Sequence, residues 1–377
     1  MTRTFDVCVI GTGGVVGLAI ARQLAAGGRS VAGIEKHESA GKETSGRNSS
    51  VIHSGFHEVR GTLKAQLALR GSGLIAEYAI GKNIPILKTG MLIAVPRGAL
   101  REGLWQEAGA LWNLWRRGRA MRVPFRFIFS ASGVREFAAV DAVGGIFIPA
   151  VHVIDVEKFL QSLEADASAA GAELSYGQEV VGIRVDGSAY VITTGRGEFR
   201  ARVLVNSAGL HAHEISRMAG GPEYSMEFLR GDYYEMAGGM ARWNIPALVY
   251  PAMPPRSPSK GIHFSPRTDG RLFIGPDARL VPAPASYESY EKDATPKEVF
   301  LAAARKFLPQ IREDDLQWSY CGIRPKLAAK SGKADFVIRV DRTDVPLINL
   351  VGIDSPGLSA SLAIGEYVDS MVRETGV

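Results

Sequence analysis

The start of the chain alternates apolar segments of two kinds. Phe5–Ile10 is a short apolar run that ends in glycine, as buried strands do, and Val15–Ala26 has the spacing of a helix that closes at Gly27 and Gly28. Ser30–Ile34 is a second short apolar run. This strand–helix–strand order predicts a parallel sheet at the start of the chain.

Further helices and strands are predicted downstream. Helical spacing of apolar residues recurs in residues 63–79, 102–117 and 156–170. Strand patterns separated by Gly and Pro occupy residues 86–95, 179–206, 227–237, 247–251, 260–266 and 271–275. A late buried strand, Leu347–Val351, precedes a final helix from about Leu358 to Arg373. The pattern is one of α/β ends around a β-rich middle.

The fold class that this pattern predicts is α/β (α+β), with a Rossmann-like nucleotide-binding domain and an inserted β-rich substrate domain. We expect the nucleotide-binding domain to be discontinuous and to comprise residues 1–80, 150–220 and 320–377. The substrate domain is expected to comprise residues 81–149 and 221–319.

The composition is that of an ordinary globular chain. Its 377 residues, 46% of them hydrophobic and 22% charged, are enough for two domains. No stretch approaches the roughly 20 apolar residues that span a bilayer, and the first residues lack a signal-peptide pattern, so a cytoplasmic location is expected. Cys8 and Cys321 make neither a disulfide framework nor a metal-ligand cluster, and no metal is expected.

The net charge of +5 favours anionic partners. No nucleic-acid motif is present, so we expect a small anionic substrate and no nucleic acid. Residues 104–115 have apolar positions at helical spacing and three tryptophans, and arginines follow at 116, 117, 119 and 122. A basic, tryptophan-bearing helix of this kind can lie peripherally on a membrane surface; the alternative is that its tryptophans pack on their own domain.

A glycine-rich turn lies between the first strand and the first helix. Its sequence runs Gly11, Thr12, Gly13, Gly14, Val15, Val16, Gly17. Glycines let backbone approach a pyrophosphate, and the helix N-terminus supplies N–H donors. Glu35, at the end of the second strand, can accept hydrogen bonds from a ribose, while Lys36 leaves a 2′-phosphate open. The turn carries one residue more than G-x-G-x-x-G, and it does not choose between nicotinamide and flavin.

Four later segments favour flavin. Residues 44–55 read TSGRNSSVIHSG, residues 206–211 read NSAGLH, residues 322–326 read GIRPK, and residues 352–361 read GIDSPGLSAS. In this order they resemble the D-amino-acid-oxidase-like superfamily of FAD-dependent oxidoreductases, with the L-2-hydroxyglutarate dehydrogenases and oxidases as the nearest resemblance. The resemblance covers nearly the whole chain.

The resemblance implies non-covalent FAD and oxidation of a 2-hydroxy acid to the 2-oxo acid by hydride transfer, with electrons passing to oxygen or a membrane quinone. It implies cofactor contacts from Gly11, Gly13, Gly14, Val15, Val16, Glu35, Lys36, Thr44, Ser45, Arg47, Asn48, Ser49, Val180, Ala208, Gly209, Gly322, Arg324, Ser355, Pro356, Gly357, Leu358 and Ser359.

The sequence departs from the family pattern at three places. His57 and Glu58 stand where two tyrosines are usual, residues 151–155 read VHVID instead of TGIVD, and Asp354 replaces a glutamate. We expect the first two departures to lie near the substrate.

Candidate catalytic groups follow from the chemistry of C–H oxidation, which requires a fixed substrate and a base. Arg324 is the candidate carboxylate anchor, and Lys326 would face the same side of an extended segment; a surface ion pair is the alternative. His53 and His263 are candidate bases, because neutral imidazole titrates near working pH, although either is equally a packed core histidine. Additional substrate contacts are expected from Tyr233, Tyr234 and His57.

The start of the last helix, at Ser355–Leu358, is expected to point its positive end at the flavin. Alternative functions remain at this point: oxidation of an amino acid or secondary amine by the same flavin chemistry, a non-catalytic flavin-binding protein, and, less favoured, a nicotinamide dehydrogenase.

Overall fold

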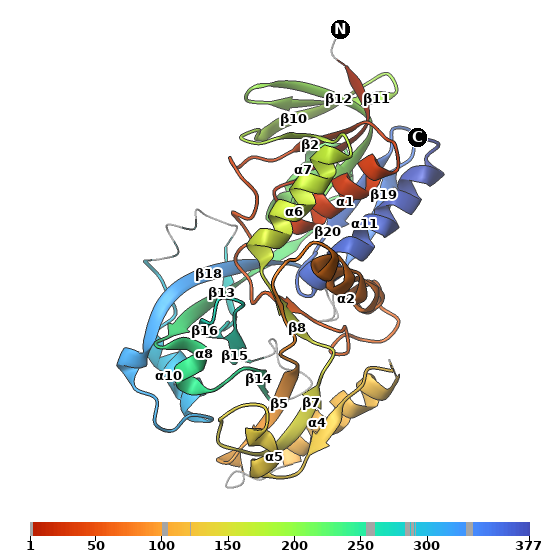
Figure 1. Cartoon of the computed structure of the whole chain (residues 1–377). Coiled ribbons are helices and arrows are strands. Elements are labelled where there is room, and N and C mark those ends of the chain that lie inside the picture. Colours follow the sequence, from red (N-terminus) through yellow and green to blue (C-terminus); the bar gives the residue numbers. More distant parts are fainter. Residues whose placement is uncertain are drawn as a thin grey trace.

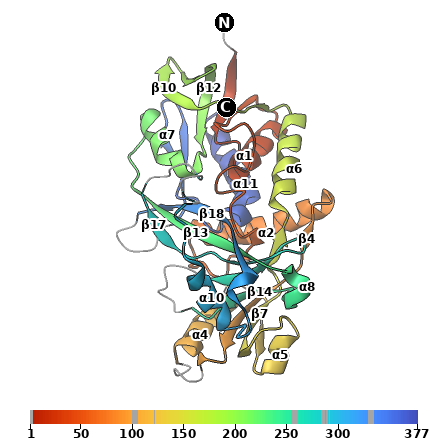
Figure 2. The same cartoon turned by 90° about the vertical axis from the view of Figure 1, so that its left-hand side faces the viewer.

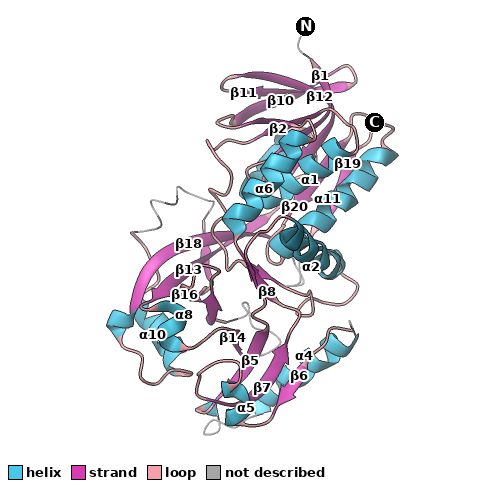
Figure 3. Ribbon diagram, in the orientation of Figure 1, coloured by secondary structure: helices cyan, strands magenta, loops and turns pink. Residues whose placement is uncertain are grey.

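Two large β-sheets form the framework of the protein (Figure 1). The computed structural model describes residues 3–99, 105–120, 122–253, 261–282, 287, 290, 292–328 and 335–377. Figure 3 shows the strands of the two sheets at opposite ends of the molecule, with helices packed against each. The expected α/β (α+β) class is confirmed.

The first sheet is built around the predicted opening. Its strands, in order, are β10 (Val180–Asp186), β11 (Ala189–Thr194), β12 (Gly197–Asn206), β1 (Thr4–Ile10), β2 (Val31–Ile34) and β9 (Glu173–Ser175), with β20 (Leu347–Val351) beside β12 and β19 (Val337–Arg342) beside β20. Strand β1 runs parallel to both of its neighbours, so the start of the chain lies in the centre of this sheet.

The two faces of β1 explain how helices cover this sheet. Val7 and Val9 face the helices α1 (Val15–Ala26), α2 (Leu63–Gly81), α6 (Val156–Ala169) and α11 (Gly357–Glu374). Cys8 and Ile10 face the other way, into a cluster with the β10–β12 hairpins and α7 (Ala212–Met218). Successive residues of a strand point to opposite faces, so the wholly apolar run reads as a strand buried on both sides.

The second sheet carries the middle of the chain. Its strands, in order, are β17 (Arg279–Val281), β13 (Met226–Met236), β16 (Leu272–Gly275), β15 (His263–Pro266), β14 (Leu248–Pro251), β5 (Met91–Pro96), β7 (Ala142–Ile148) and β6 (Arg126–Ile128), and β18 (Leu316–Leu327) pairs with β13. One face packs on α5 (Ala131–Arg135), α8 (Gly239–Trp243) and α10 (Lys297–Arg305), and the other on α4 (Trp105–Ala120).

A small sheet of β3 (Val51–Ile52), β8 (His152–Ile154) and β4 (Ile86–Leu87) lies between the large ones (Figure 1), and short 3₁₀ turns occur at η1 (Gly209–His211) and η2 (Glu313–Asp315). The segments that make the first sheet fall within the expected nucleotide-binding segments. The expected boundary at residue 320, however, falls inside β18, which belongs to the second sheet. The expected helix over 102–117 begins at Trp105 in the described part of the chain, and residues 102–104 lie outside it.

The first helix packs unusually close to the turn that precedes it. A Cβ added to Gly17 would lie 2.2 Å from the carbonyl oxygen of Gly11, and Gly11 itself has a φ of +94°. Only glycine fits where two backbone segments approach this closely. Gly17 therefore takes the place of the third glycine, and the extra residue of the turn is accommodated before it.

We expect Gly17→Ala to destabilise the protein by about 1–3 kcal/mol, because the new Cβ would meet backbone that has no room to move aside. The measurement is denaturant unfolding, with the melting temperature as a second readout. Gly73→Ala is the matched control, since a Cβ on this exposed position of α2 meets nothing within 4 Å and raises helix propensity. Equal stability of the two variants would contradict the close packing.

Candidate active site

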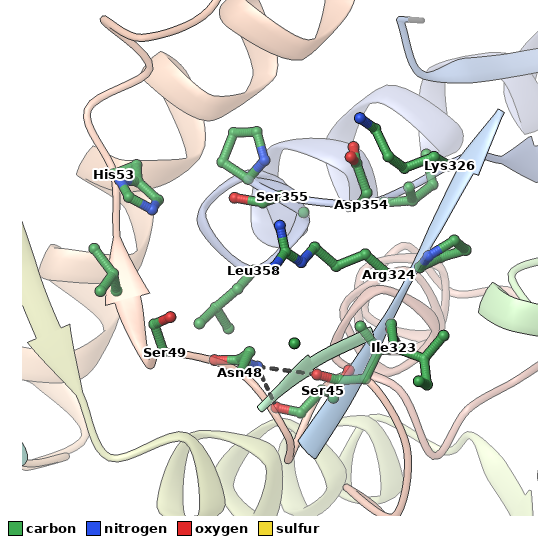
Figure 4. Close-up of a pocket in the computed structure, with 18 of the residues that line it drawn as sticks. Ser45, Asn48, Ser49, His53, Ile323, Arg324, Lys326, Asp354, Ser355 and Leu358 are labelled. Atoms are coloured by element: carbon green, nitrogen blue, oxygen red, sulfur yellow. Dashed lines mark hydrogen bonds between the residues drawn. The ribbon is translucent and has the colours of Figure 1, made fainter. Parts of the chain in front are cut away.

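A cavity of about 560 Å³ lies where the two sheets meet. It is lined by the β1–α1 turn, by residues 42–49, by the turn at 207–210, by β18 and by the start of α11. At its other end it is lined by residues of α4, β14 and β15. Figure 4 shows part of it, with Arg324 reaching into the space between the 45–49 segment and the start of α11. The cavity thus connects the glycine-rich turn with the strands of the second sheet.

The glycine-rich turn holds the acidic side chain at the end of β2. The Gly13 N–H donates to Oε2 of Glu35 at 2.9 Å, and the His37 N–H donates to Oε1 at 2.9 Å. A Cβ on Gly13 would lie 2.5 Å from the same carboxylate. Both carboxylate oxygens keep lone pairs, so Glu35 is fixed and still able to accept hydrogen bonds from a ribose diol.

Two helix N-termini open into the cavity. Gly14 precedes α1 and Pro356 precedes α11, and neither contributes a side-chain cap. Both residues line the cavity. The Val15 N–H of α1 donates to the Ser45 hydroxyl. The remaining first-turn N–H groups, together with the helix dipole, can bind a phosphate or a partly negative carbonyl. The cavity therefore suits an elongated ligand that carries such groups at two separated points, as FAD does.

Hydrogen bonds fix the 44–49 segment between these helices. The Thr44 hydroxyl donates to the carbonyl of Ile323 at 2.9 Å, which ties the segment to β18. The Asn48 amide donates to the carbonyls of Thr44 and Ser45 (Figure 4). The Ser49 and Tyr233 hydroxyls are hydrogen-bonded at 3.0 Å. The 44–49 segment is thus attached to β18 and β13 of the second sheet, although in the chain it comes directly after strand β2 of the first sheet.

Arg324 extends from β18 into the cavity. Its Nη2 donates to the carbonyl of Asp277 at 2.9 Å, and among the described residues no carboxylate pairs with it. Lys326 also lines the cavity, whereas the Cys321 side chain is buried on the opposite face of the strand in an apolar cluster. The strand alternation therefore brings Arg324 and Lys326 to one face, as expected. A guanidinium oriented by a neutral carbonyl keeps its positive charge available to an anion.

Histidine and tyrosine side chains line the end of the cavity that is formed by β14 and β15. His263 stacks on Tyr250 with ring centroids 3.8 Å apart, and its Nδ1 donates to the carbonyl of Gly261 at 3.0 Å. Since a carbonyl only accepts, Nδ1 carries the proton and neutral His263 has its lone pair on Nε2. Burial raises the pKa of the Tyr233 and Tyr250 hydroxyls, so both stay protonated and act as donors.

His53 and His57 line the same cavity, with ring centroids 6.2 Å apart. The His57 ring also packs on Phe56, at 3.9 Å. Of the departures from the family pattern, His57 and Glu58 line the cavity. His152 does not: it lies in β8, where burial lowers its pKa.

Most of the residues expected to contact cofactor or substrate line the cavity: Gly11, Gly13, Gly14, Val15, Val16, Glu35, Thr44, Ser45, Arg47, Asn48, Ser49, His53, His57, Ala208, Gly209, Tyr233, His263, Gly322, Arg324, Lys326, Ser355, Pro356, Gly357 and Leu358. Their placement is shown, while their individual roles stay predictions.

Four expected contacts lie elsewhere. Tyr234 points away from the cavity, donates to the carbonyl of Thr295 and packs on α10, because neighbouring residues of a strand face opposite sides. Val180 begins β10 and packs against the core of the first sheet. Ser359 is fully buried, and its hydroxyl accepts the His53 N–H, so it positions the backbone of His53. Lys36 pairs with other side chains.

Lys36 belongs to a cluster of charged side chains next to the carboxyl end of β2. We call this cluster, which consists of Lys36, Glu43, His211 and Glu214, the 36–43 clasp. The Lys36 ammonium lies 2.7 Å from Glu43 and 2.8 Å from Nε2 of His211, and Nδ1 of His211 lies 2.9 Å from Glu214. Although burial opposes it, hydrogen bonding to His211 and Lys36 lowers the pKa of Glu43 to about 2, and Glu43 raises the pKa of His211. The clasp joins the segment after β2 to the turn after β12.

The sequence reasoning missed a buried ion pair at the cavity. The ammonium of Lys64, at the start of α2, bonds to Asp354, just before α11, and both line the cavity. Asp335 accepts the N–H groups of Leu63 and Lys64 and so caps α2. Asp354 was noticed as a departure from the family pattern, but nothing in the spacing pointed to Lys64 as its partner.

Comparison with known proteins decides the family. The model of the DAO family, described as FAD dependent oxidoreductase, matches residues 6–371. The chain belongs to this family. This DAO-family protein is therefore an FAD-dependent oxidoreductase, and FAD is its cofactor.

Individual relatives are oxidoreductases, and their names give different substrates. The protein is 31% identical to the mitochondrial L-2-hydroxyglutarate dehydrogenase of Arabidopsis thaliana, over 96% of this chain and 82% of that one. It is 28% identical to the glycerol 3-phosphate dehydrogenase of Caloramator mitchellensis, over 98% and 74%. The FAD-bound L-alpha-glycerophosphate oxidase of Mycoplasma pneumoniae has a similar structure, with a TM-score of 0.85, 26% identity and coverage of 98% and 95%.

The pKa shifts in the 36–43 clasp make the stability of the protein depend on pH. Glu43 contributes fully to the free energy of unfolding above its ordinary pKa of 4.5, and this contribution is lost as the pH falls towards about 2. His211 contributes fully below its ordinary pKa of 6.5 and loses its contribution as the pH rises through its raised value. We therefore expect His211→Asn to lower the melting temperature most between about pH 4.5 and 6.5, by the equivalent of about 0.5 kcal/mol because the pair is partly exposed.

The measurement is the difference in melting temperature between wild type and variant from pH 4 to 9. His213→Asn is the control, because burial lowers the pKa of His213 and its removal should have the opposite pH trend. A His211→Asn deficit that is the same at pH 5.5 and pH 9 would show that His211 contributes by packing alone.

Proposed function

We propose that this protein oxidises a small 2-hydroxy acid to the corresponding 2-oxo acid. The observation that carries the proposal is Arg324, a guanidinium that reaches into the cavity, is oriented by the Asp277 carbonyl, and pairs with no carboxylate among the described residues. A cation held in this way recognises the carboxylate of a substrate in a bidentate manner. The names of the 2-hydroxyglutarate relatives support the same substrate class.

The remaining groups fit the oxidation of an H–C–OH group, which loses a hydride from its carbon and a proton from its oxygen. Arg324 fixes the carboxylate, and Tyr233 and Tyr250, which line the cavity, offer hydroxyl donors to the substrate. Nε2 of His263 takes the hydroxyl proton, while the substrate Cα gives up hydride as its carbonyl forms. Bound FAD supplies the two-electron acceptor. The first-turn N–H groups of α11 favour negative charge close to it.

A panel of substrates under anaerobic conditions tests the proposal. Loss of visible flavin absorbance with L-2-hydroxy acids, and not with glycerol 3-phosphate, amino acids or secondary amines, is the expected result. Bleaching by glycerol 3-phosphate alone would assign Arg324 and Lys326 to a phosphate. Bleaching by an amine, with release of ammonia or amine, would assign the site to C–N oxidation.

Arg324→Ala is expected to raise KM for the hydroxy acid by about 10²-fold, because the substrate carboxylate loses its charged hydrogen bonds. Flavin content should not change. The exposed Arg305 of α10 gives the control Arg305→Ala. Loss of flavin from Arg324→Ala with an unchanged KM would assign the guanidinium to the cofactor instead.

His263→Asn is expected to lower kcat by about 10²-fold or more, with little change in KM, because the proton acceptor is lost. The acidic limb of the pH–kcat profile should disappear with it. His53→Asn is the comparison, since His53 lines the same cavity. If His53→Asn removes the limb and His263→Asn does not, His53 is the base.

A further inference from the structure

An aromatic and basic surface covers one end of the molecule. Trp112 of α4 is 57% exposed, Phe127 of β6 is 37% exposed, and Phe129, just after β6, is 88% exposed. In Figures 1 and 2, α4 lies at the end of the molecule away from the N-terminus. We call the exposed residues Trp112, Arg116, Arg119, Arg122, Phe127 and Phe129 the α4–β6 face.

Aromatic rings contact one another in two groups on this face. Trp112 stacks on Trp115 with centroids 4.5 Å apart, and the Phe127 and Phe129 rings stack at 5.7 Å. Phe125 lies edge-on to Phe127 at 5.7 Å, and its ring lies beside Gly118 of α4. Exposed aromatic rings that are grouped on one surface, unlike single scattered ones, mark a contact surface.

The charge of the face is positive. Arg116, Arg119 and Arg122 are exposed, and within the described part of the chain none of them has an ion pair; Arg119 lies over the Trp115 ring at 5.6 Å. The neighbouring acids do not cancel this charge, because Glu136 is paired with Arg126 and Glu107 lies at the first turn of α4. Arginines beside exposed indole and phenyl rings match the anionic headgroup region of a bilayer, where such rings insert at the polar boundary.

The opposite side of α4 lines the cavity. Ala110, Asn113 and Leu114 line it, whereas Trp112 and Arg116 point outwards, as the 3.6-residue period of a helix requires. One helix therefore separates the cavity from the α4–β6 face. None of the helices in the described ranges is long and apolar enough to cross a bilayer, so a membrane contact here would be peripheral.

We propose that the α4–β6 face docks on anionic phospholipid bilayers. The rings insert at the boundary of the headgroups, and Arg116, Arg119 and Arg122 pair with lipid phosphates or carboxylates. Docking in this way brings the helix that lines the cavity against the membrane, which favours an electron acceptor dissolved in the bilayer, such as a quinone. The docking itself does not depend on which substrate is oxidised.

Vesicle flotation with the purified, flavin-loaded chain tests the proposal. Wild-type protein should partition at least tenfold more strongly onto phosphatidylglycerol-containing vesicles than onto pure phosphatidylcholine vesicles, and high salt should weaken the binding. Arg116→Glu with Arg119→Glu, and separately Trp112→Ser with Phe129→Ser, should each reduce partitioning at least tenfold. Flavin content and melting temperature should stay at wild-type values, because these side chains are exposed.

Two controls lie on other surfaces. Arg305→Glu reverses an exposed charge on α10, and Ile80→Ser removes an apolar side chain of α2 that is 62% exposed. Both should bind vesicles as the wild type does. Binding that does not distinguish anionic from neutral lipid, or that survives both pairs of substitutions, would overturn the proposal. Sedimentation equilibrium gives the remaining outcome: a dimer that Trp112→Ser with Phe129→Ser dissociates would assign the face to a second copy of the chain.

Discussion

Backbone segments from distant parts of the chain approach one another around the cavity without intervening side chains. Gly17 lies on the Gly11 carbonyl in the first sheet, and a Cβ on Gly322 of β18 would lie 1.9 Å from the carbonyl oxygen of Arg47. The second contact joins the segment after β2 to the other large sheet. Because such contacts tolerate no added methyl group, the distance between the sheets, and with it the shape of the cavity, is fixed by backbone rather than by adjustable side chains.

The same rigidity controls where charge lies. Asp354 lies shortly before α11, which begins at Gly357, and an unpaired negative charge there would reduce the positive potential of the helix N-terminus. Lys64 holds this carboxylate instead, in a pair whose side chains are about nine-tenths buried. Arg324 is likewise oriented by a carbonyl and not by an acid. Positive potential therefore remains where Arg324 enters the cavity and at the start of α11, as binding of negatively charged groups at these two points would require.

Local signals in the sequence predicted much of this arrangement. Helix α1 and strand β20 have the expected bounds, Val15–Ala26 and Leu347–Val351, because each is a strongly apolar segment bounded by turn residues. Strand β18 was not among the predicted strands, although Arg324 and Lys326 were expected to lie in an extended segment. It is nevertheless a long strand. It tolerates Pro325 because, among the described residues, it pairs with β13 alone, so its other edge has no ladder that needs the missing N–H.

In the candidate site, too, some features follow from neighbouring residues in the sequence, and others depend on tertiary packing. Tyr233 and Tyr234 are adjacent on β13, so strand geometry alone allows only one of them to face a given side, and the sequence could have excluded the pair. It could not have chosen Tyr233, because that depends on which face of the sheet meets the 44–49 segment. Lys64 and Asp354 lie far apart along the chain and meet only through the packing of α2 on α11. Residues that belong to a contiguous motif can therefore be recognised in the sequence. Residues such as Lys64, which neutralises the charge of a motif residue from a distant helix, can be identified only from the packing of the helices.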